Sequence, residues 1–470
     1  MENVKEKLQV IYQQHLICFL EDLSPNQRTP FLHQIEGLNF QKIPQWVDTY
    51  VKNDDSVKIP EHFEPAPSYC AHPKTAEDAQ KYASATQLGE DLICQGKVAG
   101  FVVAGGQGTR LGFDGPKGNY PTSPVKNKTL FQIFAENLLA TGNKFNTVIP
   151  FYIMTSPLNY DATVEIFESA DFYGLGAENV FIFQQGTLPN FNFAGKILLS
   201  EKDKIASSPD GHGGSLKALY SSGAVADMQK RGVETLSYWQ VDNPLVRVID
   251  PLFIGLHTLD QAEMSSKALL KTGPMEKVGN FCMVDGKVTV IEYSDLPDEA
   301  AHRKSPDGSL AFELGSIGIH MINVSFIEKL NKDGDFALPF HRAVKKIPYI
   351  DENGNRVEPE SPNGVKLETF VFDALPLAKH SVILLTLREE EFAPVKNATG
   401  TDSAEVTRQM MTDRAAAWLE AAGVKVSQKP DGTPDCTLEV APSFALTPED
   451  LKAKLDQIPP IKSGDTLYLK

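Results

Sequence analysis

A glycine-rich stretch directly after a short apolar run narrows the possible folds of this chain. Residues 98–103 read VAGFVV, and residues 104–118 read AGGQGTRLGFDGPKG. A short apolar run that ends at glycine predicts a buried strand. A glycine-rich turn between a strand and a helix lets backbone N–H groups approach an anion closely, and the helix amino end adds its positive dipole. The pattern therefore predicts a phosphate-binding loop at the end of a strand.

Two well-known phosphate loops do not match this stretch. The dinucleotide fingerprint G-x-G-x-x-G fails because Leu111 stands where the third glycine belongs, and the P-loop ending G-K-[ST] is absent. Arg110 and Lys117 lie inside the stretch instead. Two fixed cations beside a glycine turn indicate a triphosphate whose phosphorus is attacked, because they stabilise the charge that develops on it. A tight structural turn with solvated charges is the alternative.

Apolar runs of strand length alternate with helix-like segments between about residues 97 and 375. Strands are predicted at 98–104, 148–154, 180–184 and 236–241, and a helix is predicted at 128–141, where apolar side chains form one stripe. This alternation predicts an α/β fold, Rossmann-like, with a mainly parallel (mixed) sheet that helices cover on both faces.

The length of 470 residues predicts two or three domains. Helical spacing up to about residue 55 and a proline-rich stretch up to about residue 76 predict an N-terminal helical cap and linker over residues 1–95. The alternating pattern then occupies residues 96–378. One more apolar run, a helix-like stretch around 403–422 and a tail with turns predict a small α+β domain over residues 379–470.

Charge and cysteine content exclude several classes of protein. A formal net charge of -16 repels polyanions, so we expect no nucleic-acid or membrane partner, and any basic site must be local. The five cysteines are scattered and form no C-x-x-C pair, which is typical of free thiols in a reducing compartment. No segment has the features of a signal peptide or a membrane span. We therefore expect a cytoplasmic protein.

The glycine-rich stretch also resembles a known signature. GGQGTRLG (105–112) followed by PKG (116–118) resembles the signature of the eukaryotic-type UDP-sugar pyrophosphorylases, and is most similar to that of the UDP-N-acetylglucosamine pyrophosphorylases. The resemblance runs from about residue 15 to residue 400 and includes several motifs in order, which is more specific than any one of them. These motifs are FQQGTLP (183–189), SPDGHGG (208–214), VDNPLV (241–246), VIEYSD (290–295), PNGVKLETFVFD (362–373) and PVKNA (394–398).

The resemblance implies a nucleotidyltransferase reaction for the central domain. In this family UTP meets a sugar 1-phosphate, whose phosphate oxygen attacks the α-phosphorus in line and expels pyrophosphate. The nucleophile is already anionic, so no general base is required, and the rate depends on positioning two polyanions and shielding their repulsion. The resemblance implies that Arg110, Lys117 and Lys396 bind the phosphates, with Lys117 nearest the reacting one. Lys366 is a weaker cationic candidate.

Asp242 is the candidate metal ligand. It follows the predicted strand at 236–241, so its carboxylate should emerge at the carboxyl edge of the sheet, where open α/β folds bind ligands. Mg²⁺ requires such an oxygen and retains several waters. An aspartate after a strand also forms helix caps and turns, but the match to the family's metal-site aspartate favours Mg²⁺ as the cofactor.

The resemblance assigns further residues to the two substrates. Gln185 carries both a donor and an acceptor, as the uracil edge requires. Three glycines would bring the backbone close to the nucleotide, namely Gly105, Gly106 and Gly211. Glu292 resembles the residue that accepts hydrogen bonds from sugar hydroxyls, and Gly279, Phe370 and Phe372 would shape the wall beside it. The alternation of the two phenylalanines is equally typical of strand core.

Two positions depart from the UDP-N-acetylglucosamine pattern. The family's D-G-N-G-G is D-G-H-G-G here, with His212, and its G-N-I element has Ser316 in place of the asparagine. A histidine in G-H-G resembles the UDP-glucose and broad UDP-sugar pyrophosphorylases. His212 is assigned to the nucleotide-binding residues together with Gly211, although it could instead be a structural hydrogen-bonding residue. Ser316 is too short to reach the sugar without a water. These departures leave the reaction unchanged. N-acetylglucosamine 1-phosphate is favoured, and glucose or galactose 1-phosphate is the alternative.

Two other classes of function compete with this one. A nicotinamide-dependent oxidoreductase is disfavoured because the dinucleotide fingerprint fails. A noncatalytic protein that binds a nucleotide sugar would not need Arg110, Lys117, Asp242 and Lys396 together. An oxidoreductase would bind NADH and not UTP, whereas a uridylyltransferase would bind UTP. Release of pyrophosphate distinguishes a uridylyltransferase from a noncatalytic binding protein.

Overall fold

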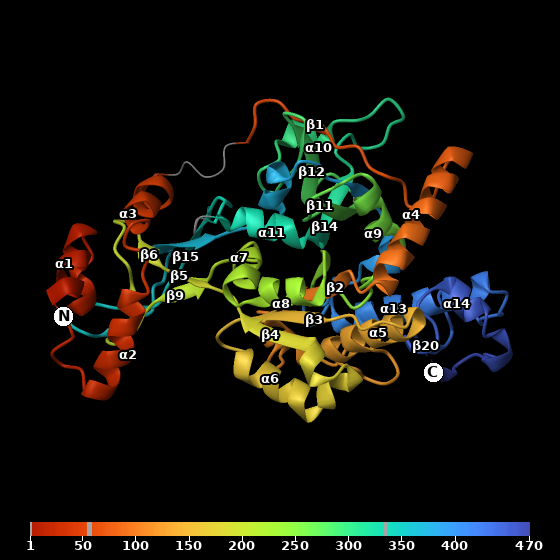
Figure 1. The fold of residues 1–470 in the computed structure, drawn as a ribbon, viewed down its shortest axis with the longest axis horizontal. Coiled ribbons are helices and arrows are strands. Elements are labelled where there is room, and N and C mark those ends of the chain that lie inside the picture. The colour runs from red at the N-terminus through yellow and green to blue at the C-terminus, as the bar shows by residue number, and fades with distance from the viewer. Residues whose placement is uncertain (1, 54–58, 333–335) are drawn as a thin grey trace. The chain divides into compact units, whose positions relative to one another are not determined.

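A ten-stranded mixed sheet forms the centre of the larger part of the chain (Figure 1). Seven strands follow one another across it in the order β1 (Glu64–Pro65), β12 (Gly279–Val284), β14 (Leu314–Asn323), β10 (Thr235–Gln240), β2 (Val98–Val103), β3 (Phe151–Thr155) and β4 (Val180–Gln184). The others branch from this path and are β11 (Met264–Leu270), β13 (Lys287–Ile291) and β19 (Ile383–Leu385).

The structure is a computed structural model that describes residues 2–53, 59–332 and 336–470. The chain divides into two units, each built from separate stretches of sequence. The first contains Met1–Ile59, Gln185–Leu216 and Ala337–Asp373, and the second contains Pro60–Gln184, Lys217–Phe336 and Ala374–Lys470. These boundaries differ from the predicted ones at 95/96 and 378/379. Residues 1 and 54–58 of the predicted cap and linker, and 333–335 of the predicted central domain, lie outside the described residues.

The strands next to the glycine-rich stretch are parallel. β2 pairs with β10 on one side and with β3 on the other, and β3 pairs with β4, all in parallel register. β14 pairs with β10, β11 and β12 in antiparallel register, so the sheet is mixed. The predicted mixed α/β sheet is confirmed, and the four predicted strands are found as β2, β3, β4 and β10.

Helices pack on this sheet. The predicted helix at 128–141 is found as α5 (Leu130–Phe145), whose first turn is capped by the Thr129 side chain. Its apolar stripe belongs to one hydrophobic cluster with α6 (Tyr160–Ser169) and with alternate strand residues such as Val102, Ile153 and Trp239. On α8 (Ala224–Arg231), Asp227 accepts a hydrogen bond from the Tyr152 hydroxyl at 2.7 Å. Helices α7 (Gly214–Ser221), α10 (Asp298–His302) and α11 (Val324–Leu330) also lie between β9 and β15 in the chain.

Helix α4 (Ala76–Cys94) packs against α9 (Pro251–Leu259), although the sequence placed it with the N-terminal cap. Two glycines permit the close approach of these helices. A Cβ added at Gly89 would lie 1.9 Å from the carbonyl oxygen of Pro251, and one at Gly255 would lie 1.7 Å from that of Ala85. The glycine in each helix therefore permits the close packing of α4 on α9 within the second unit.

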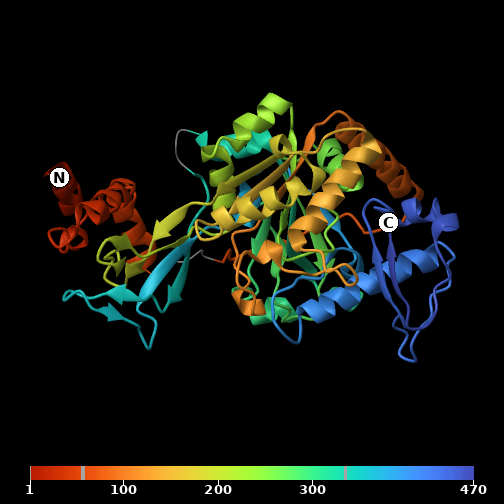
Figure 2. The same cartoon turned by 90° about the horizontal axis from the view of Figure 1, so that it is seen from below.

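The last part of the second unit has a hydrophobic cluster of its own. α13 (Ala404–Ala421) packs against β20 (Thr437–Val440), which pairs in parallel with β21 (Thr466–Leu469) beside it (Figure 2, blue). Side chains from these elements and from α14 (Pro448–Lys452) share the cluster, including Trp418, Leu438 and Leu451. The short helix α12 (Arg388–Glu391) precedes them.

The first unit joins the N-terminal helices to two later segments. α1 (Glu2–Val10), α2 (Pro25–Glu36) and α3 (Ile43–Trp46) share a hydrophobic core with a small sheet whose strand order is β15 (His341–Lys345), β18 (Gly364–Glu368) and β6 (Phe191–Asn192). The other strands of the first unit form three two-stranded ribbons. These are β5 (Thr187–Pro189) with β9 (Ser207–Pro209), β7 (Leu199–Glu201) with β8 (Lys204–Ile205), and β16 (Tyr349–Ile350) with β17 (Arg356–Val357). Leu8, Phe31, Phe191 and Leu367 are all fully buried in this core.

All five cysteines are free, as their spacing predicts. Among the described residues, no helix combines the length and the apolar character that crossing a membrane requires.

Candidate active site

The glycine-rich stretch leaves β2 and folds back on itself. Gln107 and Pro116 form an isolated antiparallel bridge, and the N–H of Gly108 donates to the carbonyl of Gly115 at 2.9 Å. The N–H of Lys117 donates to the carbonyl of Gly106 at 3.1 Å. The loop therefore returns Lys117 to the end of β2, beside the exposed Gly106.

A buried asparagine fixes the start of this loop. The Nδ2 atom of Asn159 donates to the carbonyls of Ala104 and Gly106 at 3.0 and 3.2 Å, and its Oδ1 accepts from the N–H of Ser156 at 2.8 Å. Asn159 is 1% exposed, so these bonds are shielded from water. Sequence reasoning missed this residue because no local motif distinguishes it from an ordinary helix-start asparagine.

Lys117 lies beside the predicted metal ligand. Its Nζ is 3.5 Å from Oδ2 of Asp242, and both side chains are mostly buried. Asp242 comes two residues after β10, and β10 is the parallel neighbour of β2. Because the carboxyl ends of neighbouring parallel strands meet at one edge of a sheet, the loop and the aspartate converge there, as predicted.

Arg110 does not take part in this contact. It lies in the short 3-10 turn Thr109–Leu111, is exposed, and forms no ion pair or hydrogen bond with the residues that the structure describes. A free, exposed guanidinium at the rim of the loop is compatible with binding a phosphate, but its predicted role stays a prediction.

The segment that carries Lys396 runs along Asp242. The N–H of Val395 donates to the backbone carbonyl of Asp242 at 2.8 Å, and Val395 shares a small hydrophobic cluster with Leu111 of the glycine-rich loop. The Nζ of Lys396 itself lies 4.0 Å from Oδ2 of Asp402 and is partly exposed. The second unit thus gathers the glycine-rich loop, Asp242 and the Lys396 segment at one place.

Three residues predicted to contact the sugar also lie together. Gly279 on β12 is the register partner of Ser316 on β14. A Cβ added at Gly279 would lie 3.6 Å from Oε1 of Glu292 and 3.7 Å from Cβ of Ser316. The same added Cβ would lie 2.6 Å from Cγ1 of Val290, so only glycine fits this position.

The other predicted residues belong to the first unit. Gln185 is buried, and its Nε2 donates to Oδ1 of Asp210 at 3.4 Å. Gly211 has φ +86°, and an added Cβ would lie 2.3 Å from the carbonyl oxygen of Thr369, so the fold itself requires glycine there. Lys366 forms an ion pair with Glu368 on the same strand.

Rings stack around His212. Its ring lies 5.2 Å from that of Phe370 at an interplanar angle of 14°, and 5.7 Å from that of Phe372. Phe370 stacks in turn on His341 at 4.1 Å. Phe372 lies in the 3-10 turn Val371–Leu377, which follows the end of β18, so the strand interpretation of the two phenylalanines is wrong.

The comparisons with known proteins agree with these motifs. A model of the UTP–glucose-1-phosphate uridylyltransferase family matches residues 50–470. The chain belongs to this family.

Individual relatives carry more specific names. The human UDP-N-acetylhexosamine pyrophosphorylase-like protein 1 is 35% identical over 97% of this chain and 94% of its own. The UDP-N-acetylglucosamine pyrophosphorylase of Saccharomyces cerevisiae is 36% identical over 78% of this chain and 77% of its own. The crystal structure of the uridine diphosphate N-acetylglucosamine pyrophosphorylase from Trypanosoma brucei has a TM-score of 0.83, with 24% identity, and covers 99% of this chain and 97% of its own. That likeness shows the fold.

In this uridylyltransferase family member, His212 is neutral. Burial lowers its pKa to about 4. Its Nδ1 accepts a hydrogen bond from the N–H of Val371 at 3.1 Å, so Nε2 carries the proton. His341, whose Nε2 lies 2.7 Å from Oδ2 of Asp373, completes the stack. Sequence reasoning missed His341 and Asp373, because the ring stack that they extend begins at His212, more than a hundred residues before His341 along the chain.

The residues at Asp242 suit a hydrated divalent ion. The described residues contain no group of three or more His, Cys, Asp or Glu side chains that could enclose a metal. A single carboxylate at a strand end is enough to bind Mg²⁺, because this ion keeps several of its waters and takes its other ligands from substrate phosphates. Asp242 is therefore the residue that would hold such an ion.

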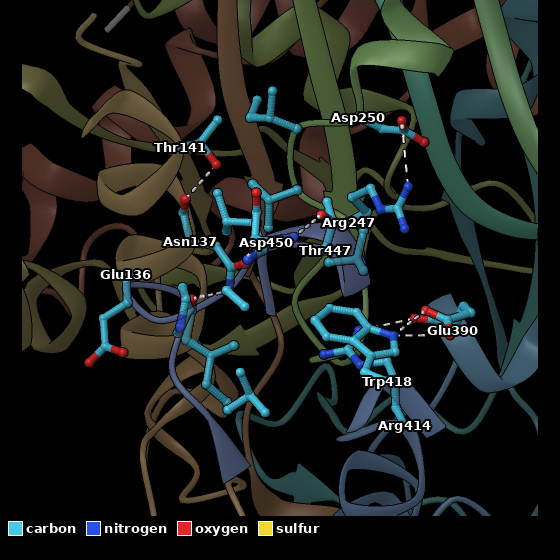
Figure 3. A pocket seen from close by; sticks show the side chains of 18 of the residues that line it. Glu136, Asn137, Thr141, Arg247, Asp250, Glu390, Arg414, Trp418, Thr447 and Asp450 are labelled. Carbon is cyan, nitrogen blue, oxygen red and sulfur yellow. Dashed lines mark hydrogen bonds and ion pairs between the residues drawn. The ribbon is translucent and has the colours of Figure 1, made fainter. Parts of the chain in front are cut away.

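A separate cavity of about 470 Å³ lies beside α13 (Figure 3). It is lined by Asn137 and Thr141 of α5, by Arg247 and Asp250, and by Arg414 and Trp418 of α13. Burial lowers the pKa of Arg414 to about 10, and its guanidinium donates to the carbonyls of Leu245 and Glu390. None of the predicted site residues lines this cavity.

Proposed function

We propose that this protein is a uridylyltransferase that makes a UDP-sugar and pyrophosphate from UTP and a hexose 1-phosphate. Family membership supports the reaction class. The observation that carries the proposal is the contact between Lys117 and Asp242 at the carboxyl ends of two parallel strands, next to the glycine-rich loop.

The chemistry needs charge rather than a base. A phosphate oxygen of the sugar 1-phosphate attacks the α-phosphorus of UTP, the new P–O bond forms, and the bond to the β-phosphate breaks as pyrophosphate leaves. The negative charge on the attacking oxygen, the nonbridging oxygens and the leaving group must be balanced throughout. Lys117 supplies a fixed positive charge, and the exposed backbone at Gly106 supplies N–H donors close to it. Arg110 and Lys396 add positive charge from the loop and from the later segment.

Mg²⁺ is part of this proposal. When bound, it would screen the repulsion between the two anionic substrates and the leaving pyrophosphate. Asp242 would hold it, and the neighbouring Lys117 prevents the carboxylate from adding uncompensated negative charge to the site. The roles of Gln185, Gly211 and His212 in binding the nucleotide stay predictions of the sequence.

N-acetylglucosamine 1-phosphate is the favoured sugar substrate. Relatives named as UDP-N-acetylglucosamine pyrophosphorylases support it, as do Gly279 on β12 and Glu292, which lie together. Glucose or galactose 1-phosphate is the second candidate, because His212 and Ser316 replace two asparagines of the N-acetylglucosamine pattern. A cytoplasmic location also stays a prediction.

One experiment tests both the reaction and the sugar. Release of pyrophosphate is measured with UTP and Mg²⁺ against N-acetylglucosamine, N-acetylgalactosamine, glucose and galactose 1-phosphates. We expect turnover with at least one of them, fastest with N-acetylglucosamine 1-phosphate. UDP-sugar binding without turnover would identify a noncatalytic binding protein, and binding of NADH but not UTP would overturn the assignment.

A further inference from the structure

A buried lysine joins two carboxylates from distant parts of the chain. Lys267 on β11 is 1% exposed, and its Nζ donates to Oδ2 of Asp250 at 2.6 Å. It also donates to both carboxylate oxygens of Glu391, at 2.5 and 2.7 Å. Burial acts to raise the pKa of Asp250, but the charges of Lys267 and Arg247 outweigh it and hold that pKa below its usual value. The Asp250 carboxylate is therefore ionised at neutral pH.

From Glu391 a series of hydrogen bonds leads to Asp242. The Nδ2 of Asn243 donates to the backbone carbonyl of Glu391 at 2.7 Å, and its Oδ1 accepts from the N–H of Ala393 at 3.1 Å. Two residues later, the N–H of Val395 donates to the carbonyl of Asp242 at 2.8 Å. Alternate residues 391, 393 and 395 are thus tied to Asp242 and Asn243, and Lys396 follows immediately.

Other donors act on the same carboxylates. The Oγ1 of Thr386 donates to Oε1 of Glu391 at 2.8 Å, and the backbone N–H of Arg247 donates to its Oε2 at 3.3 Å. The guanidinium of Arg247 points to Asp250 from the cavity side, with Nη1 3.9 Å from Oδ1 (Figure 3). Two cations and two anions therefore lie together, and all of them except Arg247 are buried. Such a cluster holds its partners firmly, because the loss of one member leaves a buried charge uncompensated.

We propose that Lys267 is a positioning residue for Lys396: by binding Glu391 it holds residues 391–396 along Asp242 and Asn243, where the Lys396 side chain can reach the phosphates. This inference rests on the proposed uridylyltransferase function. Because Lys267 is 1% exposed, a substrate cannot reach it from solvent, and it acts only through the placement of this segment. A displacement of about 1 Å is enough to lower the rate of a positioned reaction by about 100-fold.

A double-mutant cycle between Lys267→Met and Lys396→Ala tests this role. Methionine keeps the length of the lysine stem but removes the ammonium, so Glu391 loses its partner. In the otherwise unchanged enzyme, we expect Lys267→Met to lower kcat by about 10-fold or more and to leave KM for UTP within about threefold. In the Lys396→Ala background, Lys267→Met should change kcat by less than about twofold, because the Lys396 side chain that Lys267 positions is already absent.

Lys128→Met is the matched control. Lys128 is also a buried lysine of the second unit, and its Nζ contacts Glu136 at 2.5 Å and the hydroxyl of Tyr468 at 2.7 Å, but it has no link to residues 391–396. This control should lower Tm and change kcat by the same factor in both backgrounds. Equal factors for Lys267→Met in the two backgrounds, or an unchanged kcat in the single variant, would overturn the positioning role.

Thr386→Val covers the case in which Lys267→Met does not fold. This variant removes only one hydrogen bond to Glu391 and keeps every charge. We expect a smaller loss in kcat than in Lys267→Met, of about threefold or more, because one hydrogen bond to Glu391 is removed while its ion pair with Lys267 remains. This loss should again disappear in the Lys396→Ala background. An equal loss in both backgrounds would contradict the proposal. Failure of the proposed function itself is recognised separately, since the unsubstituted protein would then release no pyrophosphate with any sugar 1-phosphate.

Discussion

Lys117 and Asp242 are separated by 125 residues, and yet the Nζ of the lysine lies 3.5 Å from Oδ2 of the aspartate. The contact brings the predicted phosphate-binding cation and the predicted metal-binding carboxylate to the ends of two neighbouring strands. Each side chain partly neutralises the other, so both charges can remain in a mostly buried place. A triphosphate that carries Mg²⁺ has a negative phosphate to match Lys117 and a positive ion to match Asp242.

Substitution of either residue should therefore impair catalysis. We expect Lys117→Ala and Asp242→Ala each to lower kcat by at least ~100-fold, since preorganised charge at a reacting phosphate contributes several kcal/mol. Steady-state release of pyrophosphate measures the effect. Lys144→Ala, which removes an exposed lysine in the last turn of α5 that pairs with Asp450, serves as the control and should retain activity. Near-normal kcat in both site variants would remove the site assignment.

Alanine substitutions at two glycines of the loop should have different effects, one on UTP binding and the other on stability. A Cβ added at Gly106 meets no atom closer than 4.0 Å, whereas one at Gly118 would lie 2.2 Å from Cζ of Phe131. Gly106→Ala should thus keep Tm within about 2 °C, as expected of an unhindered surface site, yet raise KM for UTP by about 10-fold because a methyl group blocks the backbone approach of a phosphate. Gly118→Ala should instead lower Tm. A normal KM for UTP in folded Gly106→Ala would argue against phosphate binding at this loop.

Glu292 should act on the sugar and leave the nucleotide alone. Replacing Glu292 by Gln keeps its size but removes the charge, and a hydrogen bond to a charged acceptor contributes about 1.5–3 kcal/mol. KM for the sugar 1-phosphate should rise by about 10-fold or more, and KM for UTP should stay within about threefold. Glu299→Gln, an exposed glutamate on α10, is the matched control. Equal changes in both KM values would contradict a sugar-specific role.

His212 should influence which sugar is used. His212→Asn restores the residue of the N-acetylglucosamine pattern and should shift the order of preference among sugar 1-phosphates without changing KM for UTP by more than about threefold. Because the pKa of His212 is lowered to about 4 by burial, it is neutral throughout pH 6–8, and the variant should keep the wild-type pH profile there. His33→Asn, at an exposed position, is the control. An unchanged order of preference would favour a structural role.

A second neutral histidine should make the fold sensitive to acid. His257 is 1% exposed, its ring nitrogens contact Ser265 and Asn323, and burial lowers its pKa from 6.5 to about 4. The unfolded chain binds this proton below pH 6.5 and the folded chain does not, so the free energy of unfolding should fall by up to about 3 kcal/mol between pH 6.5 and 4. Urea unfolding at a series of pH values measures the slope. His257→Gln should be less stable at pH 7 but should have a shallower slope, and an equal slope would contradict the assignment.

Local patterns were enough to predict the parts of the sheet that carry the site. The apolar run at 98–103 and the glycines after it specify a strand and a turn without reference to the rest of the chain, because strand burial and glycine backbone freedom are short-range properties. Asp242 at a strand end was predicted in the same way. Asn159, His341, Asp373 and Lys267 carry no such local pattern, and their partners are known only once the chain has folded.

What the sequence by itself determined is therefore the set of local elements and the chemical groups at their ends. The tertiary structure alone decided which of these groups meet. The backbone of Val395 donates directly to Asp242, Lys267 binds Glu391 of the same segment, and the N-terminal helices share a core with residues 185–216 and 337–373. Such contacts join residues that are far apart in the sequence, and their choice depends on how all the buried side chains pack together rather than on any one segment.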